Sequence, residues 1–264
     1  TRALSSAASD VYKRQFIQWD NMKNYIEGTI IRIGYGNDIQ SQDDDAAIRN
    51  MDECERLGIP YGVYLYSYAL DYYDAASETA HALRLLKGRS PELGVWFDME
   101  DADGYKARNG LDVYSEGELL SDFCEMFVNA MRVSGYKTGV YANYNYFTNV
   151  LDLDRLKSIP EMNIWLAHWE IDSPSLDCTM WQFGAVEIED EEYDGNIYYS
   201  DYSVKNDGNT DETIRTDDSS SNNINVYYQT KLATGRWLPV VKNNEDYAGI
   251  RGQNITGLAI TTDT

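Results

Sequence analysis

The sequence is poor in the residues that build metal centres and disulfide frameworks. Its 264 residues include only 3 Cys and 2 His. Cys54, Cys124 and Cys178 are widely spaced and never form a CxxC pair, which argues against a disulfide framework and against a zinc site. The sequence also lacks the GxGxxG and GxxxxGK[ST] phosphate-binding loops, which disfavours nucleotide-binding folds.

Basic residues and long apolar runs are scarce as well. Lys and Arg total 22 against 44 Asp and Glu, which gives a formal net charge of −22. Phosphate backbones and anionic lipid head groups repel such a chain, so we expect no nucleic-acid binding. No apolar stretch approaches the roughly 20 residues that span a bilayer, so we expect no membrane insertion. Residues 1–15 contain no apolar segment of the signal-peptide type.

Aromatic residues, by contrast, are abundant. The chain has 22 Tyr and 6 Trp, and 43% of its residues are hydrophobic, which is ample for a folded core. Flat amphipathic rings stack on sugar faces as readily as they fill cores. The composition therefore leaves carbohydrate binding and plain packing both open.

Short apolar runs of strand type alternate with longer helical segments. The expected strands are 29–36, 59–69, 94–100, 137–144, 163–169 and 178–184, and the expected helices are 43–58, 74–88 and 115–135. Gly58 is a helix-ending signal, and Ser115 with Glu118 forms a capping box at the start of the third helix. Alternation with crossovers of this length indicates parallel strands, in a doubly wound sheet or a barrel. The interpretation that we favour is an α/β fold, an irregular TIM-like β/α barrel.

The chain divides into four parts by composition. We expect an atypical N-terminal segment at 1–15, the barrel at 16–203, an acidic and aperiodic linker at 204–223, and a small all-β module at 224–264. The module is near the lower size limit for independent folding.

Two carboxylates end the strand 94–100. In an extended strand the side chains of Asp98 and Glu100 point to one face, about 6.6 Å apart along the chain. Mutual repulsion and partial burial would raise the pKa of at least one of them. Glycoside hydrolysis needs such a pair, with one carboxyl protonated and the other ionised. In so acidic a chain, however, a bare DxE motif is also common at a solvated strand end.

The order of the apolar runs adds a second observation. IQWDNMK, TIIRIGYG, VYLYSY, FDME, GVYAN, IWLAHW and MWQFG follow one another over residues 16–203. This series resembles glycoside hydrolase family 25, the cell-wall lysozymes. The resemblance implies an irregular eight-stranded β/α barrel that hydrolyses the β-1,4 bond between N-acetylmuramic acid and N-acetylglucosamine without a metal or cofactor.

The resemblance also assigns roles to residues. Glu100 matches the proton donor of the family, and Asp98 the acid two residues before it. Asp98 would either orient the substrate's 2-acetamido group for attack on the anomeric carbon or act as a direct nucleophile. Arg32 inside an apolar strand needs an acidic partner, and the carboxylate cluster would provide one. Residues matching groove positions are Arg32, Tyr35, Tyr64, Tyr66, Tyr141, Trp165, Trp181 and Gln182.

Two acids of the family pattern are displaced in this chain. An Asp normally ends the first strand, where residues 1–15 offer only Asp10. Another Asp normally ends the barrel, where this sequence has Tyr198 or Tyr199. Asp194 and Asp201 are the further candidates for that position.

The leading hypothesis is therefore a peptidoglycan hydrolase of the muramidase type, acting on glycan strands outside the cell or at the cell wall. A catalytically impaired peptidoglycan-binding protein on the same scaffold is the first alternative, and another glycosidase of the chitin type is the second. The segment 224–264 is similar to small repeats appended to wall lytic enzymes, with Trp237 as its expected ligand contact.

Overall fold

The computed structural model describes residues 2–7, 17–199, 226–232, 241–242 and 255–262, with side chains for residues 17–199. The chain divides into two compact units, Thr1–Asn206 and Asp207–Thr264.

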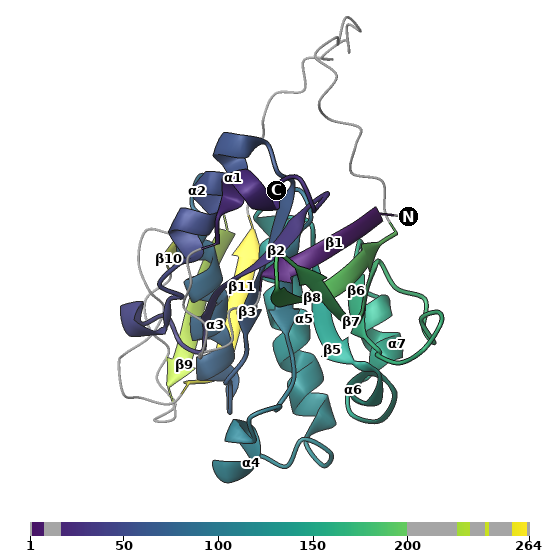
Figure 1. Cartoon of the computed structure of the whole chain (residues 1–264). Helices are drawn as coiled ribbons and strands as arrows, with labels where there is room; N and C mark the ends of the chain where they lie inside the picture. The colour runs from purple at the N-terminus through teal and green to yellow at the C-terminus, as the bar shows by residue number, and fades with distance from the viewer. Residues whose placement is uncertain (1, 8–16, 200–225, 233–240, 243–254, 263–264) are drawn as a thin grey trace, which may run out of the picture. The chain divides into compact units, whose positions relative to one another are not determined.

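The first unit is a mixed α/β fold built on eight strands whose hydrogen-bonded order follows the chain and closes on itself (Figure 1). The strands β1 to β7 are parallel, whereas β8 runs antiparallel to both of its neighbours, β7 and β1. The strands are β1 (Arg2–Ala7), β2 (Thr29–Tyr35), β3 (Tyr61–Tyr66), β4 (Val95–Asp98), β5 (Thr138–Asn143), β6 (Asn163–Ala167), β7 (Met180–Ile188) and β8 (Glu191–Tyr198).

Helices cover the outside of these strands. Helix α2 packs against β2, α3 against β2 and α5, and α5 against β4 and β5. The helices are α1 (Trp19–Met22), α2 (Ala47–Leu57), α3 (Tyr72–Leu85), α4 (Tyr105–Arg108), α5 (Gly117–Val133), α6 (Tyr144–Asn149) and α7 (Leu153–Lys157), with a 3-10 turn η1 (Gln40–Gln42). Within the described residues, no helix has the length and apolar character needed to cross a bilayer.

The three predicted helices are present as α2, α3 and α5. Of the two predicted helix-end signals, one is confirmed and the other is wrong. Helix α2 ends at Gly58 in the left-handed conformation, with φ 65°, as the glycine signal indicated. The predicted capping box of α5 is wrong, because that helix begins at Gly117 and has no side-chain cap. Ser115 belongs to the preceding turn, where its hydroxyl donates to the carbonyl of Asp112.

Apolar side chains form two separate cores because successive residues of a strand face opposite sides. The larger core fills the space between strands and helices, where for example Phe97 stacks on Phe127 with ring centroids 4.4 Å apart. The smaller core lies within the barrel and consists of Ile30, Tyr64, Leu93, Trp96, Tyr141, Trp165, Ala167, Met180 and Tyr198.

The N-terminal strand differs from the expectation drawn from the sequence. We expected the barrel to begin at residue 16, but β1 pairs with β2 on one side and β8 on the other and so closes the ring. RALSSA contains no β-branched or aromatic residue, so its composition gives no strand signal; its place in the ring comes from backbone pairing.

The second unit contains a three-stranded antiparallel sheet in the order β10–β9–β11. Its strands are β9 (Val226–Leu232), β10 (Val241–Lys242) and β11 (Ile255–Thr262). They lie within the predicted β module at 224–264. The predicted linker at 204–223 and Trp237 lie outside the described residues, and the boundaries at 203/204 and 223/224 stay predictions.

The inner core depends on a glycine in β5, which gives a first prediction. A Cβ at Gly139 would lie 2.2 Å from the carbonyl oxygen of Asn163 and 2.7 Å from the Trp96 ring. We expect Gly139→Ala to lower the free energy of unfolding by about 1–3 kcal/mol, because β5 and β6 must move apart. Urea denaturation measures this loss. Val133→Ala, at a side chain 82% exposed, is the matched control and should change stability by less than about 0.5 kcal/mol. Equal stability of Gly139→Ala and the wild type would contradict the packing described here.

Candidate active site

Strand β4 delivers the two carboxylates to one end of the barrel. Asp98 is its last residue, and its backbone is held by both neighbouring strands. The amide of Ser67 donates to the carbonyl of Asp98 at 3.0 Å, and the amide of Met99 donates to the carbonyl of Tyr141 at 2.9 Å. Glu100 lies two residues after Asp98, and its carbonyl accepts a hydrogen bond from Lys106 Nζ at 2.9 Å. The chain on which the pair lies is therefore anchored on both sides.

Both carboxyls are held in a setting that favours their protonated forms. Asp98 is only 4% exposed, and within residues 17–199 no hydrogen-bond partner reaches its Oδ1 atom. Burial, and next the charge of Glu100, raise the pKa of Asp98 well above its ordinary value. Burial also raises the pKa of Glu100, to about 7. Asp98 is the deeper of the two: it is buried, while Glu100 is partly exposed.

Two cations oppose this rise. The charges of Lys106 and, less strongly, Arg32 lower the pKa of Asp98. Arg32 lies in β2 and forms an ion pair with Asp44, with 2.9 Å between Nη2 and Oδ2. Arg32 also acts on Asp98 of the carboxylate cluster through its charge.

Aromatic rings from neighbouring strands form the floor beneath the pair. Trp165 is 2% exposed and meets Tyr141 and Tyr64 edge-on, with centroids 4.5 and 5.9 Å away. Its indole N–H donates to Asn196 Oδ1 at 2.8 Å. Trp165 and Tyr64 therefore support the site from below, and Asn196 is a supporting residue that the sequence analysis missed.

Two further tyrosines are found at the rim on the β2–β3 side. Tyr35 and Tyr66 are partly exposed, and each packs edge-on against Tyr68, with centroids 5.5 and 5.2 Å apart. The Tyr68 hydroxyl donates to Asp103 at 2.7 Å, and the Tyr66 hydroxyl accepts from the amide of Ala102 at 3.2 Å. These contacts tie the loop after β4 to the end of β3.

The opposite rim carries an open cavity of about 470 Å³. Gln182 lies at its base, where its Oε1 atom accepts from the Tyr141 hydroxyl at 3.1 Å and from the Trp169 indole at 3.0 Å. The Trp169 ring is 48% exposed, and Tyr144 stacks on His168 with centroids 4.4 Å apart. The cavity is lined by Tyr141, Asn143, Tyr144, Asn145, Ala167, His168, Trp169 and Gln182.

Trp169, Tyr144 and His168 were not among the predicted groove residues. They follow directly on β5 and β6, so their signal was available in the sequence: each comes just after the carboxyl end of a parallel strand, where barrels place their sites.

Trp181 does not belong to this group. It lies in β7 between Met180, a member of the inner core, and Gln182, so strand alternation turns its side chain to the outer face. Its indole N–H donates to the carbonyl of His168 at 2.8 Å. Trp181 thus fixes the loop that carries Trp169, and it is not one of the groove residues.

A third acid approaches the pair because β8 is antiparallel. Asp194 faces Ala185 of β7 and Ser6 of β1, toward the mouth, whereas Tyr198 faces Met180 at the other end. The charge of Asp194 raises the pKa of both Asp98 and Glu100. Of the three further candidate acids, Asp194 is therefore brought to the pair, while Asp10 and Asp201 lie outside the described residues.

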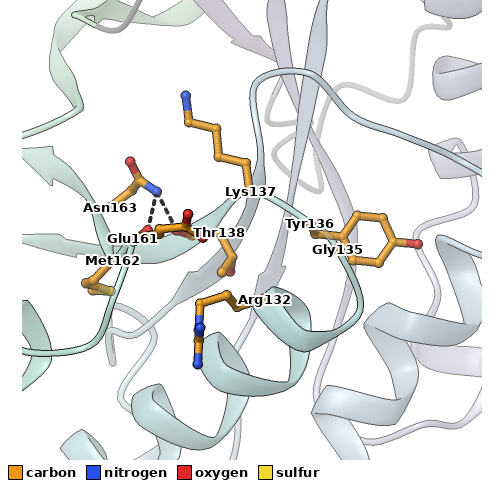
Figure 2. Close-up of a pocket in the computed structure, with 8 residues that line it drawn as sticks. All are labelled: Arg132, Gly135, Tyr136, Lys137, Thr138, Glu161, Met162 and Asn163. Carbon is orange, nitrogen blue, oxygen red and sulfur yellow. Dashed lines mark hydrogen bonds between the residues drawn. The ribbon is translucent and has the colours of Figure 1, made fainter. Parts of the chain in front are cut away.

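The barrel's other end has a cavity of different character, about 510 Å³ in volume (Figure 2). It is lined by residues around the starts of β5 and β6, and its two basic side chains, Arg132 and Lys137, point apart in Figure 2. Asn163 donates there to the carbonyls of Thr138 and Glu161, both at 2.8 Å. A single carboxylate, Glu161, lines this cavity, so it does not offer the paired acids found at the mouth. Within the described residues, no three His, Cys, Asp or Glu side chains form a group suited to a metal ion.

Comparison with known protein families identifies the barrel. The model of the family "Glycosyl hydrolases family 25" matches residues 9–192. The chain belongs to glycosyl hydrolases family 25. The carboxylate pair, the aromatic floor and the two rims all lie within the matched residues, which confirms the resemblance seen in the sequence. No curated protein matches the chain.

Solved structures of low sequence identity share the fold. The CTP1L endolysin has a TM-score of 0.61 at 17% identity, covering 76% of this chain and 68% of its own. The autolysin LytC from Streptococcus pneumoniae, in complex with a synthetic peptidoglycan ligand, has 0.61 at 20%, covering 75% and 46%. The catalytic domain of endolysin ply40 from bacteriophage P40 of Listeria monocytogenes has 0.58 at 20%, covering 76% and 94%. The chain therefore spans less than half of LytC and nearly all of the ply40 domain.

Burial of Glu100 gives a second prediction, on stability. Its pKa is about 7 in the folded chain against an ordinary 4.5, so its contribution to stability is full below about pH 4.5 and is lost as the pH rises through 7. Glu100→Gln stays neutral at all pH values. We expect it to raise the free energy of unfolding by about 2 kcal/mol at pH 8 and by only a few tenths of a kcal/mol at pH 4.

Urea denaturation at the two pH values measures the difference. Glu187→Gln, at an exposed position of β7, is the matched control and should show no such dependence. A gain in Glu100→Gln that is the same at pH 4 and pH 8 would contradict the burial argument.

Proposed function

We propose that the chain is a muramidase, hydrolysing the β-1,4 bond between N-acetylmuramic acid and N-acetylglucosamine in peptidoglycan. One observation carries this proposal: two neighbouring carboxyls with raised pKa values lie at the aromatic mouth of a barrel of this glycosidase family. CTP1L and ply40 are endolysins and LytC is an autolysin, which is consistent with this proposal. Its target, the cell wall, places its action outside the cell or after release by a phage.

In this proposal Glu100 is the general acid. A pKa of about 7 keeps a large share of its carboxyl protonated at neutral pH. It donates that proton to the glycosidic oxygen, and the C1–O bond breaks with its electron pair leaving on the N-acetylglucosamine side. In the second half of the reaction the Glu100 carboxylate takes a proton from water, which attacks C1.

Asp98 assists through the substrate in this proposal, and is not the nucleophile. A direct nucleophile must be ionised, but burial and the Glu100 charge disfavour ionised Asp98. Its Oδ1 is a buried acceptor with no partner among the described residues. The N–H of the substrate's 2-acetamido group is a donor that would satisfy it. The acetamido carbonyl oxygen then attacks C1, which is substrate-assisted catalysis.

The two rims hold the glycan strand. Exposed ring faces and hydroxyls are suited to sugars, and the chain's charge of −22 gives no electrostatic attraction to anionic wall polymers. The segment 224–264 acts in this proposal as a tethered wall-binding module, which raises the local concentration of the barrel at its substrate.

Loss of the acid tests the activity. We expect Glu100→Gln to lower turnover on purified cell walls by at least about 10²-fold, because no proton reaches the leaving oxygen. Release of reducing ends and the fall in wall turbidity measure it. Binding of the variant to walls should persist. If the wild type binds walls but releases no reducing ends, the alternative of a non-catalytic peptidoglycan-binding protein is correct.

The second rim gives a further test. Trp169 presents a fixed, half-exposed ring to the cavity, because its N–H is held by Gln182. We expect Trp169→Ala to raise KM for soluble glycan fragments roughly tenfold and to change kcat less. The reason is that stacking of a sugar on one aromatic ring is worth about 1–1.5 kcal/mol. Tyr199→Ala is the control, since Tyr199 is 44% exposed and follows β8 at the other end of the barrel. Unchanged KM in Trp169→Ala would remove this rim from the binding groove.

A further inference from the structure

A buried lysine lies directly behind the carboxyl pair. Lys106 in α4 is 0% exposed, although Lys is a residue that is almost never fully buried without partners. Its Nζ atom donates to the carbonyl of Glu100 at 2.9 Å and also to the carbonyl of Ser67. One ammonium group thus bridges the chain just after β4 to the chain just after β3.

The helix that carries Lys106 is itself held in place. Asp101 accepts from the backbone amides of Lys106 at 2.7 Å and Ala107 at 3.1 Å. The loop between Glu100 and α4 is therefore short and held by its own hydrogen bonds. The Lys106 ammonium, at the end of this loop, binds the carbonyl of Glu100, at its start. Such a closed arrangement fixes the Glu100 backbone.

A buried acid from another element faces the same point. Glu78 in α3 is 0% exposed, and its two oxygens accept from the Ser67 hydroxyl at 2.9 Å and the Tyr68 amide at 2.6 Å. Burial raises the pKa of Glu78 to about 7, and the charge of Lys106 opposes this rise. Ser67 therefore binds Glu78 through its side chain and Lys106 through its carbonyl.

Building on the function proposed above, we propose that Lys106 is a positioning residue of the carboxyl pair: it fixes the backbone of Glu100 and supplies the main positive charge facing both acids.

The other charged groups near the pair, taken element by element, support this assignment. Negative groups come from Asp101 and Asp103 in the loop after β4 and from Asp194 in β8. Arg32 in β2 is engaged by Asp44, and its effect on Asp98 ranks below that of Lys106. The remaining ionisable neighbours are the phenols of Tyr64, Tyr66, Tyr141 and Tyr146, whose own pKa values are raised, so they are neutral at working pH.

The test is a titration of the pair in variants of the full chain. Lys106→Met removes the cation, and ionised Asp98 and Glu100 then lose a favourable interaction, so the pKa values of both rise. We expect the Glu100 titration, followed by carbon NMR of labelled carboxyls, to move up by about one pH unit. The basic limb of the kcat/KM profile should move up with it, because the protonated acid persists to higher pH.

Two companion variants separate charge from folding. Glu78→Gln is the matched control: it removes the acid on the far side of Lys106 and should leave the titration of the pair in place. Lys106→Met/Glu78→Gln removes both buried charges, so it retains the fold if the single variant does not, and it should show the upward shift of Lys106→Met.

The outcomes distinguish this inference from the proposed function. If the walls are cleaved but the titration of Glu100 does not move in folded Lys106→Met or in the double variant, the role of Lys106 is wrong. If the titration moves but the wild type cleaves no walls, the role of Lys106 in the charge balance holds and the proposed function fails. An equal shift in Glu78→Gln would also overturn the assignment.

Discussion

The site depends on the burial of two neighbouring carboxyls over an aromatic floor. Strand alternation sends Trp96 and Asp98 of β4 to the same side, so the acid lies directly above the inner core. Because the rings of Trp165 and Tyr141 cannot solvate a charge, the ionised form of Asp98 is disfavoured. The same packing that closes the barrel therefore sets the protonation state on which the proposed acid catalysis depends.

Burial alone would leave both acids neutral, and only the nearby cations limit this effect. For Asp98, the charges of Glu100 and Asp194 raise the pKa as burial does, whereas those of Lys106 and Arg32 lower it. The two cations are held differently: Arg32 forms a partly buried ion pair with Asp44, and Lys106 is enclosed and bonded to backbone carbonyls. A backbone-bound, desolvated cation cannot move away from the pair, so its influence on the two pKa values is constant.

The sequence predicted much of the fold and of the site, and the exceptions have physical reasons. The alternation of apolar runs and helices predicted β2 to β7 and α2, α3 and α5, and the DxE spacing predicted that Asp98 and Glu100 share a face. Trp181 was misplaced although the rule of alternation excludes it: Gln182 and its neighbour cannot both face the groove. The sequence could not single out Asp44 as a partner of Arg32, because Asp43, Asp44 and Asp45 follow one another; in the structure Asp43 is engaged by His81 and Arg84.

The direction of β8 explains how an acid displaced in the sequence can still reach the mouth. In a parallel strand the residues near its carboxyl end lie at the mouth. If β8 were parallel, Tyr198 and Tyr199 would therefore occupy the position of the missing acid. In an antiparallel strand the residues near the amino end lie at the mouth instead. Asp194 and Asn196, which precede Tyr198, then lie nearer the mouth, with Asn196 opposite Gln182 and Tyr198 opposite Met180. Sequence order along the final strand thus gives the position of a site residue only once the direction of the strand is known. Here the antiparallel direction of β8 brings Asp194 to the pair as a third acid, although the position expected from the family pattern carries a tyrosine.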